Sequence, residues 1–208
     1  MLYKLYFKRI FDFFFALTAI IALSPLLCLI ALGLRLFQGS PILFKQKRPG
    51  LNEKPFIMVK FKTMSDACDS FGKSLPDDKR LTKFGSFLRA TSLDELPELF
   101  NVLMGNMSLV GPRPLLSRYL PYYTEEERKR HSVRPGLTGL AQINGRNFIQ
   151  WEERFKLDNF YVDNISFSSD IMIIFKTIYK VVFRDGVSVD ANKVMPDLDV
   201  YRQNKKIL

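Results

Sequence analysis

A long uncharged segment near the N-terminus most constrains how this chain folds. Residues 13–34, FFFALTAIIALSPLLCLIALGL, carry no charge, and about 20 apolar residues are enough to span a bilayer. Ser24-Pro25 interrupts the segment midway. Proline removes a backbone donor and clashes with the carbonyl four residues before it, so we expect a helix to bend here. The Ser24 hydroxyl is expected to bond a freed carbonyl near Ile21.

Basic residues flank this segment on both sides, and basic flanks stay cytoplasmic. Each arm, as a helix, reaches only about 16 Å, roughly half the hydrocarbon thickness. The pattern therefore predicts a re-entrant helix-break-helix anchor over residues 1–38. An ordinary kinked spanning helix fits the segment equally well. A cleaved signal peptide is disfavoured because no A-x-A-like site follows. The flanking residues are Lys4, Lys8 and Arg9 before the segment, and Arg35, Lys45, Lys47 and Arg48 after it.

The remaining length and the charge limit the class of protein. The chain has 208 residues, which leaves room for one domain, residues 39–188, followed by a polar tail, residues 189–208. The net charge of +10 suits an anionic partner such as a membrane surface, a nucleotide or nucleic acid. The two cysteines give no disulfide or zinc pattern. His131 lies in a charged stretch and is expected to be solvated, so histidine-based catalysis is poorly supported.

Local patterns predict the elements of this domain. Turn signals at Pro49-Gly50 indicate a β-hairpin over residues 40–63, its second strand alternating around Phe56, Met58 and Lys60. Residues 134–147 are glycine-rich and read as a loop. Residues 170–184 predict a basic amphipathic helix, either at a membrane interface or in the core with a solvated lysine stripe. A polar loop is expected over 65–80, and helices over 81–90, 92–105 with Gly105 closing, 124–130 with Thr124 capping, and 151–161. The tail after Gly186 shows no compositional sign of a packed element.

Asp94-Glu95 is the candidate catalytic centre. Ser92 and Glu95 match a capping box, which by itself would explain Glu95. Pro97 would then be interior to the helix, where it costs a hydrogen bond. Placing Pro97 at the first helical position leaves Asp94 and Glu95 just outside a helix N-terminus, where the dipole favours ionised carboxylates. An ionised aspartate can act as a nucleophile toward phosphorus.

Cations in rigid motifs surround this carboxylate pair. Arginine suits phosphate because its planar fork binds two oxygens, and phosphoryl transfer needs fixed positive charge around the phosphates. For any single cation, a solvated surface position is an equally good interpretation. The candidates are Arg89, Arg113 between two prolines in GPRP, Arg146 in NGR, and Lys60 and Lys62 at the end of the second strand.

A series of motifs resembles the small monotopic phosphoglycosyl transferases of the bacterial sugar transferase family. Residues 4–188 carry, in order, the Ser24-Pro25 break, QKRPG, KFKTM, SLDELPELFNVL, GPRPLL and RPGLTGLAQINGRN. The resemblance implies that Asp94 is the nucleophile and metal ligand and Glu95 its partner. It also implies Mg2+, a UDP-sugar donor and a polyprenol phosphate acceptor.

Together these features predict a mostly α monotopic membrane protein with a small β-hairpin, a re-entrant anchor and interfacial amphipathic helices. It would move a sugar 1-phosphate from a UDP-sugar to undecaprenyl phosphate at the cytoplasmic face of the bacterial inner membrane. Contact with anionic lipid and no binding of nucleic acid are expected. The rival is a membrane-anchored basic module that binds nucleic acid or acidic lipid. That rival explains the charge but not the cations clustered around a carboxylate pair.

Overall fold

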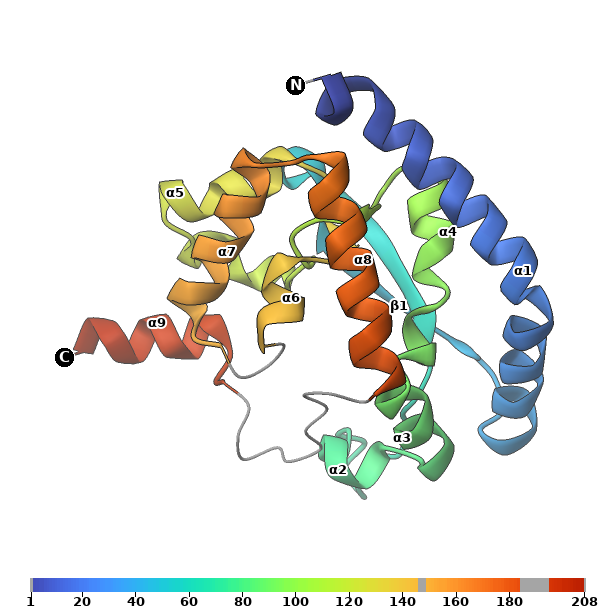
Figure 1. Ribbon diagram of the computed structural model, residues 1–208. Helices are drawn as coiled ribbons and strands as arrows, with labels where there is room; N and C mark the ends of the chain where they lie inside the picture. The colour runs from blue at the N-terminus through green and yellow to red at the C-terminus, as the bar shows by residue number, and fades with distance from the viewer. Residues whose placement is uncertain (1, 146–148, 184–194, 208) are drawn as a thin grey trace.

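The computed structural model describes residues 2–145, 149–183 and 195–207, and these residues are mostly helical with two small two-stranded sheets (Figure 1). The α-helices are α1 (Lys8–Phe37), α2 (Asp77–Arg80), α3 (Lys83–Ala90), α4 (Glu98–Leu103), α5 (Glu125–Arg128), α6 (Leu140–Gly145), α7 (Trp151–Asp163), α8 (Phe167–Val182) and α9 (Leu198–Ile207). The strands are β1 (Leu43–Pro49), β2 (Pro55–Phe61), β3 (Ser108–Val110) and β4 (Gly136–Thr138). Tighter or wider helical turns occupy η1 (Tyr3–Phe7), η2 (Leu51–Glu53), η3 (Leu93–Glu95), η4 (Ser117–Tyr122) and η5 (Lys129–Ser132).

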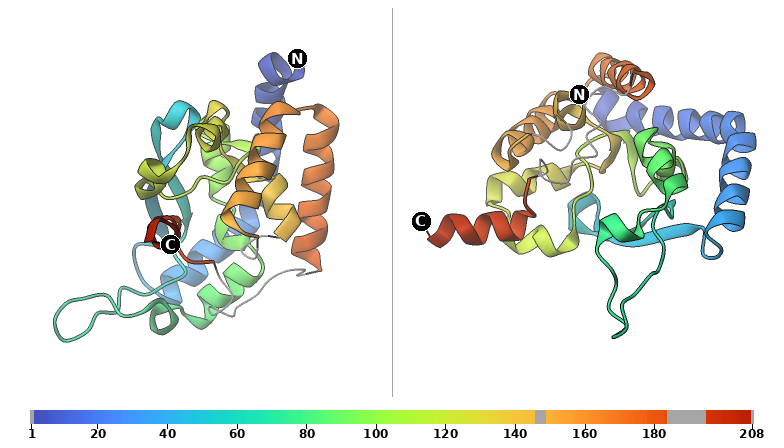
Figure 2. Two further views of the ribbon diagram at one scale, coloured as in Figure 1. Left: turned by 90° about the vertical axis from the view of Figure 1, so that its left-hand side faces the viewer. Right: turned by 90° about the horizontal axis from the view of Figure 1, so that it is seen from below.

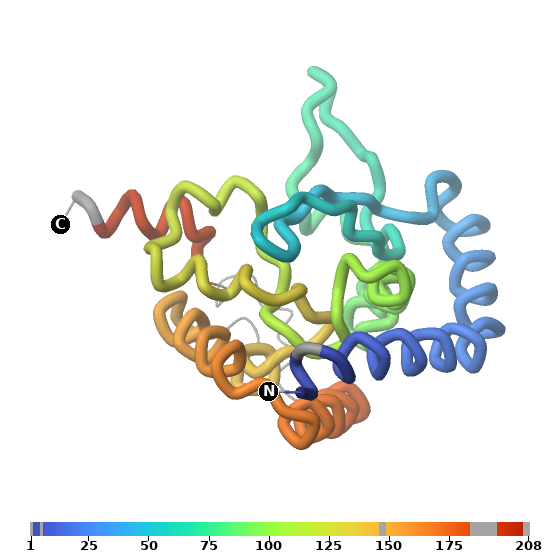
Figure 3. The backbone as a smooth tube through the Cα atoms, turned by 90° about the horizontal axis from the view of Figure 1, so that it is seen from above, coloured from blue at the N-terminus to red at the C-terminus, as the bar shows by residue number. Residues whose placement is uncertain are grey.

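Helix α1 is bent into two arms about midway along its length (Figures 2 and 3). Pro25 lies inside the helix, and the Ser24 hydroxyl donates to the carbonyl of Ile21 at 2.8 Å. Both the bend and the serine bond predicted from the sequence are therefore confirmed. By length and composition α1 is able to cross a membrane, and most of its large apolar side chains are exposed.

Buried polar contacts fix the first arm of α1 to the rest of the protein. The ammonium of Lys8 lies 2.6 Å from the carboxylate of Asp170 on α8. The hydroxyl of Tyr161 donates to the other oxygen of Asp170 at 2.6 Å. Asp12 accepts the backbone N–H of Leu109 at 3.1 Å. Because buried charges are costly unless paired, these contacts define one orientation of the arm against α7, α8 and β3.

The predicted β-hairpin is confirmed as β1 and β2, which pair antiparallel. Phe56 and Met58 alternate into the core. The amide of Asn101 on α4 bonds the free edge of β2, accepting from the N–H of Val59 at 3.1 Å and donating to the carbonyl of Ile57 at 2.8 Å. Asn101 is fully buried, so this contact sets the hairpin against α4 and places Lys60 beside the start of that helix.

The glycine-rich segment 134–147 is not the loop that its composition predicts. In its described part, residues 136–138 form β4, parallel to β3, and residues 140–145 form α6. A Cβ on Gly136 would lie 2.1 Å from the backbone nitrogen of Gly111. These glycines therefore allow two backbones to approach closely rather than marking a flexible loop.

Helix α8 confirms the predicted amphipathic helix, and its exposed face is largely apolar. A capping box joins Ser166 and Ser169 at its start. Phe175, Ile178 and Val182 are each more than half exposed. A helix in the core would hide these side chains, so the exposed apolar face favours the interfacial interpretation over the core one.

Two further expectations are wrong. His131 is buried rather than solvated, because η5 packs against α7 and its ring meets Tyr123 edge-on at 5.2 Å. Burial and the charges of Arg130 and Arg128 lower its pKa to about 3.

The tail does contain a packed element, since α9 buries Leu198 completely and the indole of Trp151 donates to the carbonyl of Pro196 at 2.9 Å. A mostly polar helix that buries few side chains leaves little compositional trace. The polar loop 65–80 projects from the body and ends in α2 (Figure 3).

Candidate active site

Asp94 and Glu95 lie in the short turn η3, between α3 and α4. Ser92, directly before this turn, has a φ of 57° and its side chain caps no backbone N–H. The capping-box interpretation is therefore wrong. Pro97 immediately precedes α4, within one residue of the position predicted for it. The turn places both carboxylates next to the end of β2.

Glu95 is held by cations from two distant segments. The ammonium of Lys60 lies 2.7 Å from its Oε1. The guanidinium of Arg113 contacts the same oxygen through Nη2, and its Nη1 lies 3.4 Å from Oε2. Burial by itself would raise the pKa of Glu95, but the charges of Arg113 and Lys60 outweigh it and hold that pKa well below its usual range. Glu95 is thus a fixed anion with both oxygens engaged.

Asp94 differs from its neighbour because it is not engaged. Its carboxylate makes no hydrogen bond or ion pair with any residue that the structure describes. Burial and the charge of Glu95 raise its pKa to about 6, against the opposing charges of Lys60, Arg113 and Arg89. A carboxyl group with this pKa is mostly ionised at neutral pH and is more basic than an ordinary aspartate. Asp94 therefore has the properties of an available nucleophile.

Glu98 is a third carboxylate at the site, one that the sequence patterns do not single out. Its Oε1 lies 3.0 Å from the ammonium of Lys60, which it shares with Glu95. Burial and the charge of Glu95 raise the pKa of Glu98 to about 7. The signal was present in DELPE, where Glu98 follows Glu95 by one helical turn.

The structure brings some of the other predicted cations to this centre and not others. The guanidinium of Arg89 donates to the hydroxyl of Thr63 at 2.9 Å, and its charge acts on Asp94. Lys62 instead pairs with Asp66 in the projecting loop. Arg146 lies outside the described residues. Among the described residues, Lys60 and Arg113 are therefore the cations in direct contact with the carboxylates.

The GPRP segment that carries Arg113 is itself held by two arginines that no sequence motif marks as site residues. Arg130 donates to the carbonyl of Arg113 at 2.8 Å, and Arg48 donates to the carbonyl of Pro114 at 3.2 Å. Arg130 is buried and pairs with the buried carboxylate of Asp158 at 2.9 Å. A rigid segment therefore presents the Arg113 fork to Glu95.

The carboxylates fit magnesium only in combination with a substrate. Within the described residues no group of three or more His, Cys, Asp and Glu side chains is placed to hold a metal ion. Mg2+, however, is commonly held by one or two carboxylates together with substrate phosphates and water. Asp94 is unengaged and fits that role, whereas Glu95 is taken up by Lys60 and Arg113.

Comparison with known proteins decides between the enzyme and the binding module. The family model described as bacterial sugar transferase matches residues 3–184. The chain belongs to the bacterial sugar transferase family. It is therefore an enzyme, a transferase, and the match covers the bent anchor, the hairpin and every described side chain of the site.

Named relatives extend this result. The uncharacterized sugar transferase EpsL of Bacillus subtilis is 53% identical over 180 residues, covering 86% of this chain and 89% of the relative. The exopolysaccharide production protein ExoY of Sinorhizobium fredii is 41% identical over 196 residues, covering 86% and 87%. The UDP-glucose:undecaprenyl-phosphate glucose-1-phosphate transferase of Escherichia coli is 40% identical over 183 residues, which cover 83% of this chain but 39% of that longer protein.

Proposed function

We propose that this transferase moves a sugar 1-phosphate from a UDP-sugar to undecaprenyl phosphate. The observation that carries the proposal is the contrast between its two adjacent carboxylates: among the described residues the Asp94 carboxylate has no hydrogen-bond or ion-pair partner, while Glu95 is held by Lys60 and Arg113. A nucleophile and fixed positive charge are the main parts that phosphoryl transfer requires from a protein. The named activity of the Escherichia coli relative agrees with this chemistry.

In the proposed mechanism Asp94 attacks the β-phosphorus of the donor. The bond from that phosphorus to the bridging oxygen breaks, UMP leaves, and the sugar phosphate stays on Asp94 as an acyl phosphate. The phosphate oxygen of undecaprenyl phosphate then attacks the same phosphorus and regenerates the carboxylate. Mg2+ bound by Asp94 and the donor's diphosphate would screen negative charge. Arg113 and Lys60 hold Glu95 in place and add fixed positive charge beside the reacting phosphates.

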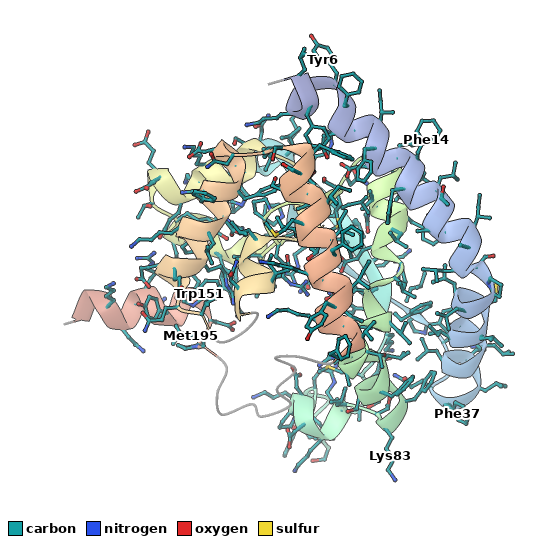
Figure 4. All side chains as sticks on the ribbon, viewed as in Figure 1. Tyr6, Phe14, Phe37, Lys83, Trp151 and Met195 are labelled. Carbon is teal, nitrogen blue, oxygen red and sulfur yellow. The ribbon has the colours of Figure 1, made fainter. Side chains whose placement is uncertain are left out.

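The apolar surfaces suggest how the site meets a lipid substrate. The arms of α1 expose Phe14, Leu29 and Phe37, and α8 exposes Phe175, and Figure 4 shows Phe14 and Phe37 pointing away from the body. We infer that α1 enters the membrane and returns to the same face, with α8 lying in the interface. The catalytic domain, residues 39–188, then works at the cytoplasmic face of the inner membrane, starting assembly of a glycan.

The nucleotide product tests the proposed reaction. Purified enzyme incubated with undecaprenyl phosphate, Mg2+ and each of a set of UDP-sugars should release UMP with at least one donor, because attack at phosphorus breaks the diphosphate. Attack at the anomeric carbon would release UDP instead. Chromatography of the nucleotides separates the two, and UDP as the product would contradict the mechanism.

Cysteine labelling tests the re-entrant anchor. In a Cys28→Ser, Cys68→Ser background, single substitutions Lys4→Cys and Lys47→Cys lie on opposite sides of the apolar segment. Both should react with an impermeant maleimide only when the cytoplasmic face is open, because the chain returns to that face. Periplasmic labelling of one of them would indicate a spanning helix. Pro25→Ala restores a backbone donor at the bend and should shift part of the population toward spanning.

A further inference from the structure

The turn η3, which carries Asp94 and Glu95, lies against the second arm of α1, the part that follows Pro25. Leu93 and Leu96, on either side of the two carboxylates, pack against a buried apolar cluster. That cluster joins this arm to α3 and β2 through Ile30, Leu34, Phe61 and Leu88. If the arm enters the membrane, as proposed above, apolar surface leads from the bilayer to the reacting carboxylates.

Three phenylalanine rings, here called the phenylalanine track, follow one another from the end of this arm onto α3: Phe37, Phe84 and Phe87. The ring centres of Phe37 and Phe84 lie 6.0 Å apart, and those of Phe84 and Phe87 lie 6.4 Å apart with their planes nearly parallel. Phe37 is 78% exposed and Phe87 is 50% exposed. Figure 1 shows the second arm and α3 side by side, and Figure 4 shows Phe37 and Lys83, the first residue of α3, at the same end of the molecule. The track is therefore an exposed apolar surface that joins the two helices.

Close backbone contacts hold α3 on both sides. A Cβ on Gly33 would lie 3.1 Å from the ring of Phe84, so this ring rests directly on the second arm. A Cβ on Gly85 would lie 1.9 Å from the carbonyl oxygen of Thr63, so the opposite side of α3 rests on the segment after β2. The guanidinium of Arg89 donates to the hydroxyl of the same threonine at 2.9 Å. A surface held in this way needs little ordering when a ligand binds to it.

The track ends beside the carboxylates. Helix α3 leads into η3, which packs mainly against α3 and β2. Arg89 follows Phe87 by two residues, and its positive charge acts on Asp94. Apolar surface therefore gives way to positive charge at this end of α3. The proposed acceptor changes in the same way, from an apolar chain to a phosphate, and ligand sites commonly combine apolar walls with a few placed polar groups.

We propose that the phenylalanine track binds the first isoprene units of the acceptor's polyprenyl chain and thereby holds its phosphate beside Asp94. This inference rests on the proposed function for the identity of the acceptor. Contact with the chain removes the exposed faces of Phe37 and Phe87 from water, which favours binding. Beyond Phe37 the chain continues along the second arm into the bilayer. Because the acceptor enters only the second step, the track acts on that step and not on transfer from the donor.

A photoreactive acceptor analogue tests where the chain lies. A prenyl phosphate with a diazirine in its second isoprene unit is added to the full chain in phosphatidylcholine nanodiscs, where bulk lipid is in large excess. After illumination, mass spectrometry should find the label at the end of the second arm and on α3, and unlabelled undecaprenyl phosphate should displace it. Label confined to α8 would overturn the proposal. Label on the track that undecaprenyl phosphate does not displace would assign the track to membrane lipid and would also overturn it.

Alanine at the two exposed rings tests how much the track contributes. Phe37→Ala and Phe87→Ala should each raise the KM for undecaprenyl phosphate by about fivefold, because each removes part of the apolar contact that a phenyl ring makes. Both side chains are exposed, so the variants should fold as the wild type does. Phe160→Ala makes the same change at an exposed ring on α7 and should leave this KM unchanged.

The first step separates this inference from the proposed function. With donor labelled in its β-phosphate and no lipid, Phe37→Ala and Phe87→Ala should be labelled as fully as the wild type. Loss of this labelling would place the track with the donor and overturn the inference. An unchanged KM for undecaprenyl phosphate in the double variant would overturn it too, and would leave the proposed reaction intact. A wild-type protein that crosslinks at the track but releases no UMP would refute the proposed reaction and keep the binding surface.

Discussion

Replacing Asp94 with asparagine should abolish both turnover and covalent labelling of the protein. Asparagine keeps the size of the side chain but has no carboxylate to attack phosphorus, and loss of a nucleophile commonly costs on the order of 10⁴-fold or more in rate. The wild-type enzyme, given donor labelled in its β-phosphate and Mg2+ but no lipid, should retain label on the protein. Addition of undecaprenyl phosphate should then remove the label, because the acceptor attacks the acyl phosphate in the second step.

Asp78→Asn is the matched control for this experiment. It makes the same chemical change on α2, where the side chain is exposed, and should leave labelling and turnover unchanged. An active Asp94→Asn enzyme would show that the nucleophile is another group. Label that appears on the wild type but persists in Asp94→Asn would lead to the same conclusion.

Some features of this protein could be predicted from the sequence because the residues that determine them are close together in the chain. The bend of α1 follows from Ser24-Pro25, and its serine bond forms within one helical turn. The hairpin follows from alternation around Phe56 and Met58 and from the turn at Pro49-Gly50. Asp94 and Glu95 stand out because Pro97 restricts where the next helix begins. In each case the determining residues lie within a few positions of one another.

Contacts between distant segments could not be predicted in this way. Arg130 and Asp158 form a buried pair that supports the carbonyl of Arg113, yet each reads as an ordinary charged residue in its own helical turn. His131 is buried for the same reason, since its surroundings are built by α7 and η2 rather than by its charged neighbours in sequence. The position of Lys62 beside Lys60 predicts that it joins the site, but it pairs instead with Asp66, four residues further along the chain.

The hydrogen bonds from Arg130 and Arg48 to the GPRP segment explain why one substitution at Arg113 should have a large effect although it keeps the positive charge. Arg113→Lys should reduce turnover by about 10²-fold, the usual cost of losing one preorganised charge stabiliser. The guanidinium of Arg113 reaches both oxygens of Glu95, and Arg130 and Arg48 fix the backbone from which it extends. Lysine keeps the positive charge but offers a single flexible ammonium, which cannot reproduce the planar fork.

The measurement is steady-state release of UMP at several donor concentrations, compared with Arg80→Lys, which makes the same change on α2. The control should behave as the wild type, because Arg80 bonds the carbonyl of Ser65 and not the carboxylates of the site. A lower kcat would mean that the Arg113 guanidinium stabilises charge that develops during transfer. A higher KM with kcat unchanged would mean that it contributes to binding of the donor. Full activity of Arg113→Lys would mean that charge by itself suffices at this position. The planar fork of Arg113 would then have no part in the reaction.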